Sequence, residues 1–216
     1  MLAYSYMLEI PYWINVHKVL VKYKKIIFKL FTFSYFLGGS IIAFGFYLFN
    51  NYPLIYLIIQ SLAKSFGTLA LFMFLATLTP GILSRFKIFP LFASSIVLFR
   101  RQLGILMFIT AMVHSFYLIT IPGIMTSQFG PDFLTIRDLL GSLSLIILLP
   151  AWLTSNNYSQ KKFGKIWKII QRVTYISLVM IFIHVAFTSL KLGVLTFGVF
   201  LLEFSSWLKV WFFDKK

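Results

Sequence analysis

The feature that most constrains this chain is a series of long apolar runs, each about as long as a bilayer is thick. The residues from Arg100 to Leu118 show the pattern, RRQLGILMFITAMVHSFYL. A helix needs roughly 20 apolar residues to cross the hydrocarbon core of a membrane. A single run of this kind satisfies its backbone hydrogen bonds in lipid by forming an α-helix. The runs therefore predict an all-α, polytopic membrane protein with a six-transmembrane-helix bundle.

Composition and charge agree with this class. The chain is 60% hydrophobic and only 12% charged, whereas a soluble domain is about 25% charged. The net charge of +15 is compatible with nucleic-acid binding, but the cations form short clusters between apolar runs. Membrane orientation explains such clusters better, so we expect a lipid bilayer and no nucleic acid as partner. The absence of cysteine excludes disulfides, thiolate-ligated haem and iron–sulfur clusters.

Breaks in the apolar pattern give the expected spans. We expect an interfacial cytoplasmic N-terminal segment at 1–25 and one six-helix membrane domain at 26–216, without an internal repeat. Its helices are expected at 26–49, 64–79, 101–120, 139–153, 167–190 and 194–212. Residues 54–63 and 91–99 are expected to lie along the membrane surface, and Pro80–Gly81 to end the second helix. His17 is expected to be solvated or at headgroup level, and no signal peptide is recognised.

Charge bias predicts the orientation. Most Lys and Arg residues fall in the N-terminal segment, in every second loop and at the C-terminus. The alternate loops hold Arg137 and Lys191, with Lys64 at their edge. Because cytoplasmic loops carry the excess of Lys and Arg, both termini are expected to be cytoplasmic. We expect a multi-pass protein of a bacterial inner or plasma membrane.

Two histidines lie deep inside apolar spans. His114 is 13 residues beyond Arg101, which places it roughly 20 Å along its helix. His184 is 12 residues beyond Arg172, or roughly 18 Å along a helix of the same direction. The two imidazoles are therefore expected at the same depth. Ionisable residues inside a membrane are costly and tend to be functional.

A matched pair of this kind suits a b-type haem, whose iron takes one imidazole on each face and then transfers electrons. Small residues should flank the ligands, and the candidates are Gly104, Thr110, Ala111, Ser177 and Thr188. The alternative is that both histidines are hydrogen-bonded packing residues. A zinc or copper site is disfavoured because no carboxylate or sulfur ligand accompanies them.

The two segments that carry these histidines resemble a known family. RRQLGILMFITAMVH and LLPAWLTSNNYSQKKFGKIWKIIQRVTYISLVMIFIH are similar to the ferric-reductase-like transmembrane domain, and GTLALFMFLATLTP to its second helix. Within the family they resemble the branch of haem-binding membrane subunits of bacterial methionine sulfoxide reductase systems. The resemblance covers roughly residues 66–187.

The resemblance implies that His114 and His184 are axial ligands of one haem b. It also implies electron transfer from a cytoplasmic-side donor to an extracytoplasmic acceptor, which in that branch is a reductase that repairs oxidised methionine. Gln171 stands where that branch has a further histidine in a W-K-x-x-H-x-x-x-Y motif. STEAP-type metalloreductase domains, which hold a single haem, also have glutamine in this region.

A single outer haem leaves roughly 20 Å to the cytoplasmic surface. Both related groups use flavin, so FMN or FAD near Arg100, Arg101, Trp167 and Gln171 is an option, with arginine pairing its phosphate or a haem propionate. These arginines are equally explained as positive-inside anchors. Quinol is another possible donor. No nucleotide-binding glycine motif is present, so a separate flavin reductase would oxidise NAD(P)H.

Three functions remain open at this stage. The first is a haem electron conduit, which is a component of an oxidoreductase system. The second is a ferric or cupric reductase acting directly at the outer face, where Asp132 and Asp138 are the available acids. The third is a cofactor-free subunit or transporter with structural histidines, for which Glu203 is the one acid in an apolar segment.

Overall fold

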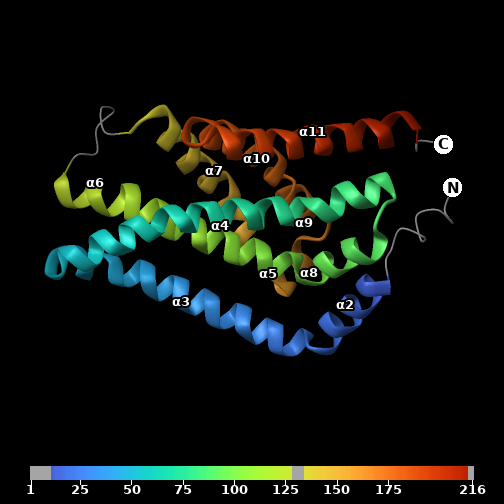
Figure 1. Ribbon diagram of the computed structural model, residues 1–216, viewed down its shortest axis with the longest axis horizontal. Coiled ribbons are helices and arrows are strands. Elements are labelled where there is room, and N and C mark those ends of the chain that lie inside the picture. Colours follow the sequence, from blue (N-terminus) through green and yellow to red (C-terminus); the bar gives the residue numbers. More distant parts are fainter. Residues whose placement is uncertain (1–10, 128–133, 214–216) are drawn as a thin grey trace.

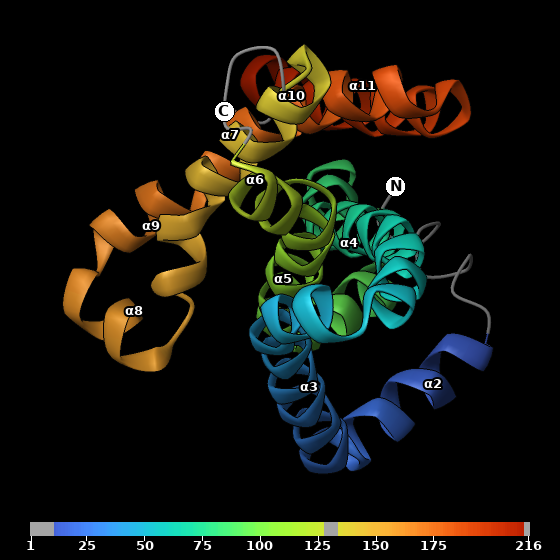
Figure 2. The same cartoon turned by 90° about the vertical axis from the view of Figure 1, so that its left-hand side faces the viewer.

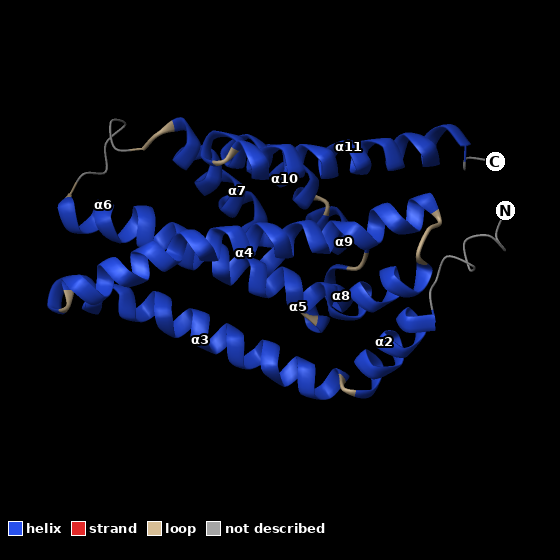
Figure 3. Cartoon of the chain, in the orientation of Figure 1, coloured by secondary structure: helices blue, strands red, loops and turns tan. Residues whose placement is uncertain are grey.

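The computed structural model describes residues 11–127 and 134–213, and throughout these ranges the chain is helical, without a strand (Figure 3). Six helical segments are long and apolar enough to cross a membrane, as predicted. They are α3 (Lys24–Asn51), α4 (Pro53–Phe86), the continuous run of α5 (Pro90–Ser115), η1 (Phe116–Thr120) and α6 (Ile121–Thr126), then α7 (Ile136–Leu153), α9 (Lys165–Gln171) with α10 (Val173–Thr188), and α11 (Leu190–Phe213).

The second span is longer than the sequence pattern predicted. The prediction of a surface segment at 54–63 and a helix end at Pro80–Gly81 was wrong, because α4 is one helix of 34 residues with Pro80 inside it. The hydrocarbon core of a membrane holds no water to bond the backbone groups of a broken turn, so an unbroken helix is favoured. Neighbouring hydroxyl side chains can bond the backbone groups that a proline leaves without a partner. It ends where Lys87 adopts a left-handed conformation with φ 59° and donates its N–H to Leu83 and Ser84.

The third span also begins earlier than predicted. Residues 91–99 do not lie along the surface but form the first turns of α5, with Pro90 at its start. They pack against α2 (Pro11–Lys22), through a ring contact of Trp13 with Phe92 at 4.9 Å and a 2.8 Å hydrogen bond between His17 and Ser95. His17 is therefore partly buried and not fully solvated, and its expected position at headgroup level stays a prediction. The described part of the N-terminal segment is an amphipathic helix on the bundle.

The long helices α4 and α5 pair at the centre of the molecule, as Figures 1 and 2 show. On one side of this pair α3 packs against α5. On the other side α7 packs against α10, and α11 contacts both α10 and α4. Large apolar side chains point outward, for example Phe36 at 76% exposure and Leu190 at 78%. In a globular protein such exposure would be costly, and in a bilayer it faces lipid.

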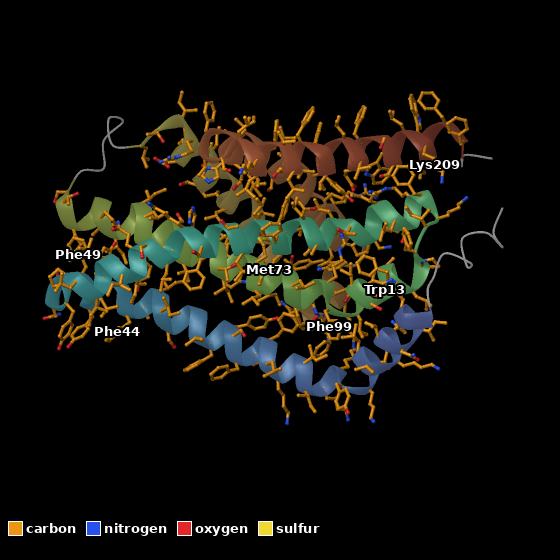
Figure 4. All side chains as sticks on the ribbon, viewed as in Figure 1. Trp13, Phe44, Phe49, Met73, Phe99 and Lys209 are labelled. Atoms are coloured by element: carbon orange, nitrogen blue, oxygen red, sulfur yellow. The ribbon has the colours of Figure 1, made fainter. Side chains whose placement is uncertain are left out.

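Different elements lie at the two ends of the bundle. The helix α2 and the end of α11 lie at one end, and α6 at the other (Figure 1). In Figure 4, Trp13 and Lys209 mark the first end, while Phe44 and Phe49 mark the second. The assignment of the first end to the cytoplasm rests on the charge bias of the loops. Residues 1–10, Asp132 and the other loop positions at 128–133 lie outside the described residues.

Candidate functional site

The site is centred on the two intramembrane histidines. His114 lies on α5, two residues before the π-helical turn η1, and His184 lies on α10. Their ring centroids are 6.4 Å apart and their planes cross at 83°. The helix arithmetic predicted the equal depth, and the fold adds that the two side chains face each other.

Both imidazoles are held in the same way. His114 Nδ1 lies 2.8 Å from the carbonyl oxygen of Ala63 on α4, and His184 Nδ1 lies 2.7 Å from that of Arg137 on α7. A carbonyl oxygen can only accept, so Nδ1 carries the hydrogen in each ring. In the neutral ring Nε2 then keeps its lone pair, which is the tautomer of a metal-ligating histidine with its outer nitrogen hydrogen-bonded.

Two glycines make this geometry possible. Gly67 and Gly141 each lie four residues after the accepting carbonyl, so their positions on the helix surface are directly above it. A Cβ at Gly67 would lie 2.6 Å from His114 Nδ1, and one at Gly141 would lie 2.9 Å from the His184 ring. Any larger residue would exclude the imidazole from the carbonyl. The sequence pattern did not single out these glycines, although a glycine inside an apolar span is a signal of close approach.

Both rings line a cavity of about 560 Å³, a volume within the range of small-molecule and cofactor sites. It is walled by α4, α5, α7 and α10, which contribute mostly apolar side chains. Phe74, Met107 and Leu148 line it as parts of the main hydrophobic core. Lys64, Arg137 and Asp138 line it as well.

The spacing of the rings fits a metal held from both sides. A metal–imidazole bond of about 2.0 Å, extended to the ring centres, puts two axial imidazole centroids about 6.3 Å apart. The observed separation of 6.4 Å is close to this value, so the spacing of the ring centroids would suit one iron. Within the described ranges no group of three or more His, Cys, Asp or Glu residues comes together. Two imidazoles beside an apolar cavity would fit a porphyrin, because a porphyrin supplies four nitrogen ligands to its iron itself.

The small residues expected around the ligands are only partly present at the cavity. Ala111 and Thr188 line it, whereas Gly104, Thr110 and Ser177 are not among its lining residues. Thr110 instead bonds the backbone of its own helix, and Ser177 is fully buried and bonds Val173. Their rotation about the helix axis turns them away, and Gly67 and Gly141 on the neighbouring helices make room instead.

The four residues expected near a flavin lie away from this cavity. Trp167 Nε1 donates to the carbonyl of Thr154 at 2.9 Å, and Gln171 Nε2 donates to that of Ala151 at 3.0 Å. These carbonyls lie at the C-terminal end of α7, where they also accept from the Asn156 N–H and from the Ser155 hydroxyl, respectively. Arg101 bonds Asn157 at 2.5 Å and Arg100 is exposed. Three of the four thus gather around residues 154–157, where Trp167 and Gln171 cap a helix.

The fold and the site define a multi-pass integral membrane protein with a histidine-lined cavity in its bundle. The chain belongs to the family described as ferric reductase like transmembrane component, whose model matches residues 66–183, more than half of the chain. The match includes His114 and ends one residue before His184.

Curated relatives carry the description protein-methionine-sulfoxide reductase heme-binding subunit MsrQ. The Brucella anthropi protein is 35% identical over 86 residues, 37% of each chain. The Agrobacterium fabrum protein is 31% identical over 96 residues, 44% of this chain and 45% of its own. The Brucella ovis protein is 35% identical over 92 residues, 40% of each chain. The chain thus spans less than half the length of these relatives, and no solved structure matches it.

Proposed function

We propose that this protein transfers electrons across the membrane through one b-type haem, with His114 and His184 as its axial ligands. The observation that carries the proposal is the pair of facing imidazoles at 6.4 Å, each with Nδ1 bonded to a backbone carbonyl. The haem, when bound, supplies an iron that alternates between two oxidation states. Filling both axial positions with imidazole favours electron transfer over oxygen binding.

The chain's own residues have definite tasks in this proposal. Ala63 and Arg137 orient the rings through their carbonyls, and Gly67 and Gly141 leave space for them. The apolar walls exclude water and lower the dielectric around the iron, which tunes its reduction potential. Such a protein is an electron-transfer component of an oxidoreductase system.

The direction of transfer follows from the proposed topology. The donor would act at the basic end and would be quinol or a flavin, supplied by a cytoplasmic flavin reductase or held near Arg100 and Arg101. The acceptor would act at the opposite, extracytoplasmic end of a bacterial inner-membrane protein. A methionine sulfoxide reductase partner is supported by the printed description of the curated relatives.

The alternatives receive less support. A direct metal reductase would gather its metal on acids at the outer face, where Asp138 is already bonded to Arg137 at 2.9 Å and to Thr135 at 2.6 Å, and Asp132 lies outside the described residues. A cofactor-free subunit with structural histidines would pack its rings against neighbours, whereas these rings border a cavity of about 560 Å³. Glu203, the acid that a transporter would use, forms an ion pair with Arg85.

The test is the oxidised-minus-reduced absorption spectrum of the purified protein. We expect a sharp low-spin b-type band, one haem per chain, and loss of that band in His114→Ala and in His184→Ala. Each substitution removes one of two axial bonds and opens a cavity in the core.

The third histidine provides a matched control. His17 bonds Ser95 and is not part of the cavity, so His17→Ala should keep the full haem band. A wild-type protein without haem, or haem retained at full amount with unchanged spectrum in both alanine variants, would rule out the proposed ligands.

A further inference from the structure

Lys64 and Arg137 are unusual among the cations of this chain. By the helix directions, three of the 20 Lys and Arg residues belong to the end of the bundle opposite the basic end, namely Lys64, Arg137 and Lys191. Two of these three line the cavity. Because cations are disfavoured on the translocated side, their concentration at one cavity requires a reason.

The two cations are tied to the two histidines. Lys64 follows Ala63, whose carbonyl holds His114, and Arg137 itself provides the carbonyl that holds His184. One cation therefore accompanies each ring, from each side of the cavity. Their backbone positions are set by the same contacts that set the imidazoles.

The charged side chains that line this cavity only partly balance one another. Asp138 pairs with Arg137 through Nε at 2.9 Å, and its other oxygen accepts from the Thr135 hydroxyl at 2.6 Å. Lys64 has no ion pair or hydrogen bond from its ammonium among the residues that the structure describes. The lining thus carries two cations and one carboxylate. This excess of positive charge beside an apolar slot suits a ligand with an apolar body and an anionic edge.

Resting on the proposed haem function, we propose that Lys64 and Arg137 bind the two propionate carboxylates of the haem. The carboxylate edge of the porphyrin then faces the end of the bundle at which α6 lies. Lys64 contributes a point charge. Arg137 donates hydrogen bonds from its two terminal NH₂ groups, while its Nε–H remains bonded to Asp138. The apolar edge of the porphyrin lies toward Phe74, Met107 and Leu148. Lys64 is therefore a ligand-binding residue.

The first experiment changes the ligand and leaves the protein intact. Membranes containing the full chain, from cells that cannot make haem, are supplied with haem b or with its dimethyl ester, which lacks both negative charges. We expect the wild type to retain the ester about tenfold less than haem b, the effect of losing one or two charge-assisted contacts. Equal retention of both would overturn the proposal. Retention of neither would contradict the proposed haem function instead.

The second experiment changes the cations. In Lys64→Gln and in Arg137→Gln, the preference for haem b over its ester should shrink, and the haem midpoint potential should fall, because a cation near the iron favours the reduced form. Arg137→Lys should restore the potential toward the wild-type value. Lys191→Gln is the matched control, since Lys191 belongs to the same end but does not line the cavity. An equal potential shift in Lys191→Gln would reduce the effect to general surface charge and overturn the proposal.

Discussion

At the scale of residues, each histidine depends on a glycine of a neighbouring helix. Gly67 faces the His114 ring and Gly141 faces the His184 ring, and in both places the side chain of any other residue would occupy the space of the imidazole. Glycine normally weakens a helix by about 1 kcal/mol relative to alanine. Glycine at these positions therefore lowers the stability of the helix but leaves the space that the imidazoles occupy.

This predicts an effect that opposes helix propensity. Gly67→Ala and Gly141→Ala should each lower the haem content severalfold and broaden the low-spin band, because the new Cβ displaces the ring from its carbonyl. Haem content per chain and the absorption spectrum measure the effect. Gly104→Ala is the control, since a Cβ there meets no atom within 4 Å, and it should keep its haem. If the three variants behave alike, the close contacts of the two cavity glycines have no functional role.

At the scale of elements, the turn after His114 departs from a regular α-helix. Residues Phe116–Thr120 form a π-helix, a wider turn that interrupts the regular hydrogen-bond ladder and is frequent at functional sites. The carbonyl of Tyr117 accepts from Tyr56 Oη at 2.9 Å and from Gln60 Nε2 at 3.4 Å, both on α4. The rings of Tyr56 and Tyr117 are also stacked at 5.4 Å. The wide turn is thus stabilised from outside its own helix.

Removing the Tyr56 hydroxyl tests this support. Tyr56→Phe keeps the ring but leaves a buried carbonyl with a weaker partner, which should destabilise the protein by about 1–3 kcal/mol. The thermal unfolding midpoint in detergent should fall, and the electron paramagnetic resonance spectrum of the haem should change as His114 reorients. Tyr52→Phe changes an exposed tyrosine nearby and should alter neither. An unchanged unfolding midpoint in Tyr56→Phe would mean that Gln60 alone is sufficient.

At the scale of the whole molecule, the site is formed between two helix pairs. The pair α4 and α5 supplies Gly67 and His114, and the pair α7 and α10 supplies Gly141 and His184. The helix α11 bridges the two pairs, because it packs against both α4 and α10. Because α5 also packs against α7, the width of the cavity depends on this contact and on how firmly α11 is held to α4.

A polar cluster near the basic end of the bundle fastens α11 to α4. Arg85 forms an ion pair with Glu203, donates to Ser206 at 2.7 Å and lies over the Trp207 ring at 4.6 Å. Lys209 donates to the Arg85 carbonyl at 3.0 Å. The Arg85 and Glu203 side chains are only 14% and 6% exposed, and Glu203 Oε2 has no hydrogen-bond partner among the described residues.

Breaking this pair on one side should cost more than removing it. Glu203→Gln leaves the Arg85 charge buried without its counter-ion, so we expect a loss of about 3–5 kcal/mol in the free energy of unfolding. Arg85→Gln should be comparable, and the double variant should recover most of the loss. Unfolding in detergent measures all three. Losses that simply add in the double variant would show that the pair is not coupled.

The sequence alone determined the all-α class, the six spans and the common depth of His114 and His184. Span length and rise per residue are local properties, so bilayer thickness and helix geometry suffice for them. It misplaced the end of α4 and the start of α5, because Pro80 lies inside its helix without ending it, and Pro90 already begins the next helix.

Only the tertiary structure decided which neighbours serve the histidines. Ala63 lies 51 residues from His114, and Arg137 lies 47 residues from His184. Their contacts depend on the rotation of each helix about its axis, which the packing of all the helices sets together. The same rotation turned Gly67, Gly141, Lys64 and Arg137 toward the cavity and Thr110 and Ser177 away from it. An amino-acid pattern shows which face of a helix is apolar, whereas the packing of the whole bundle determines which helix that face contacts.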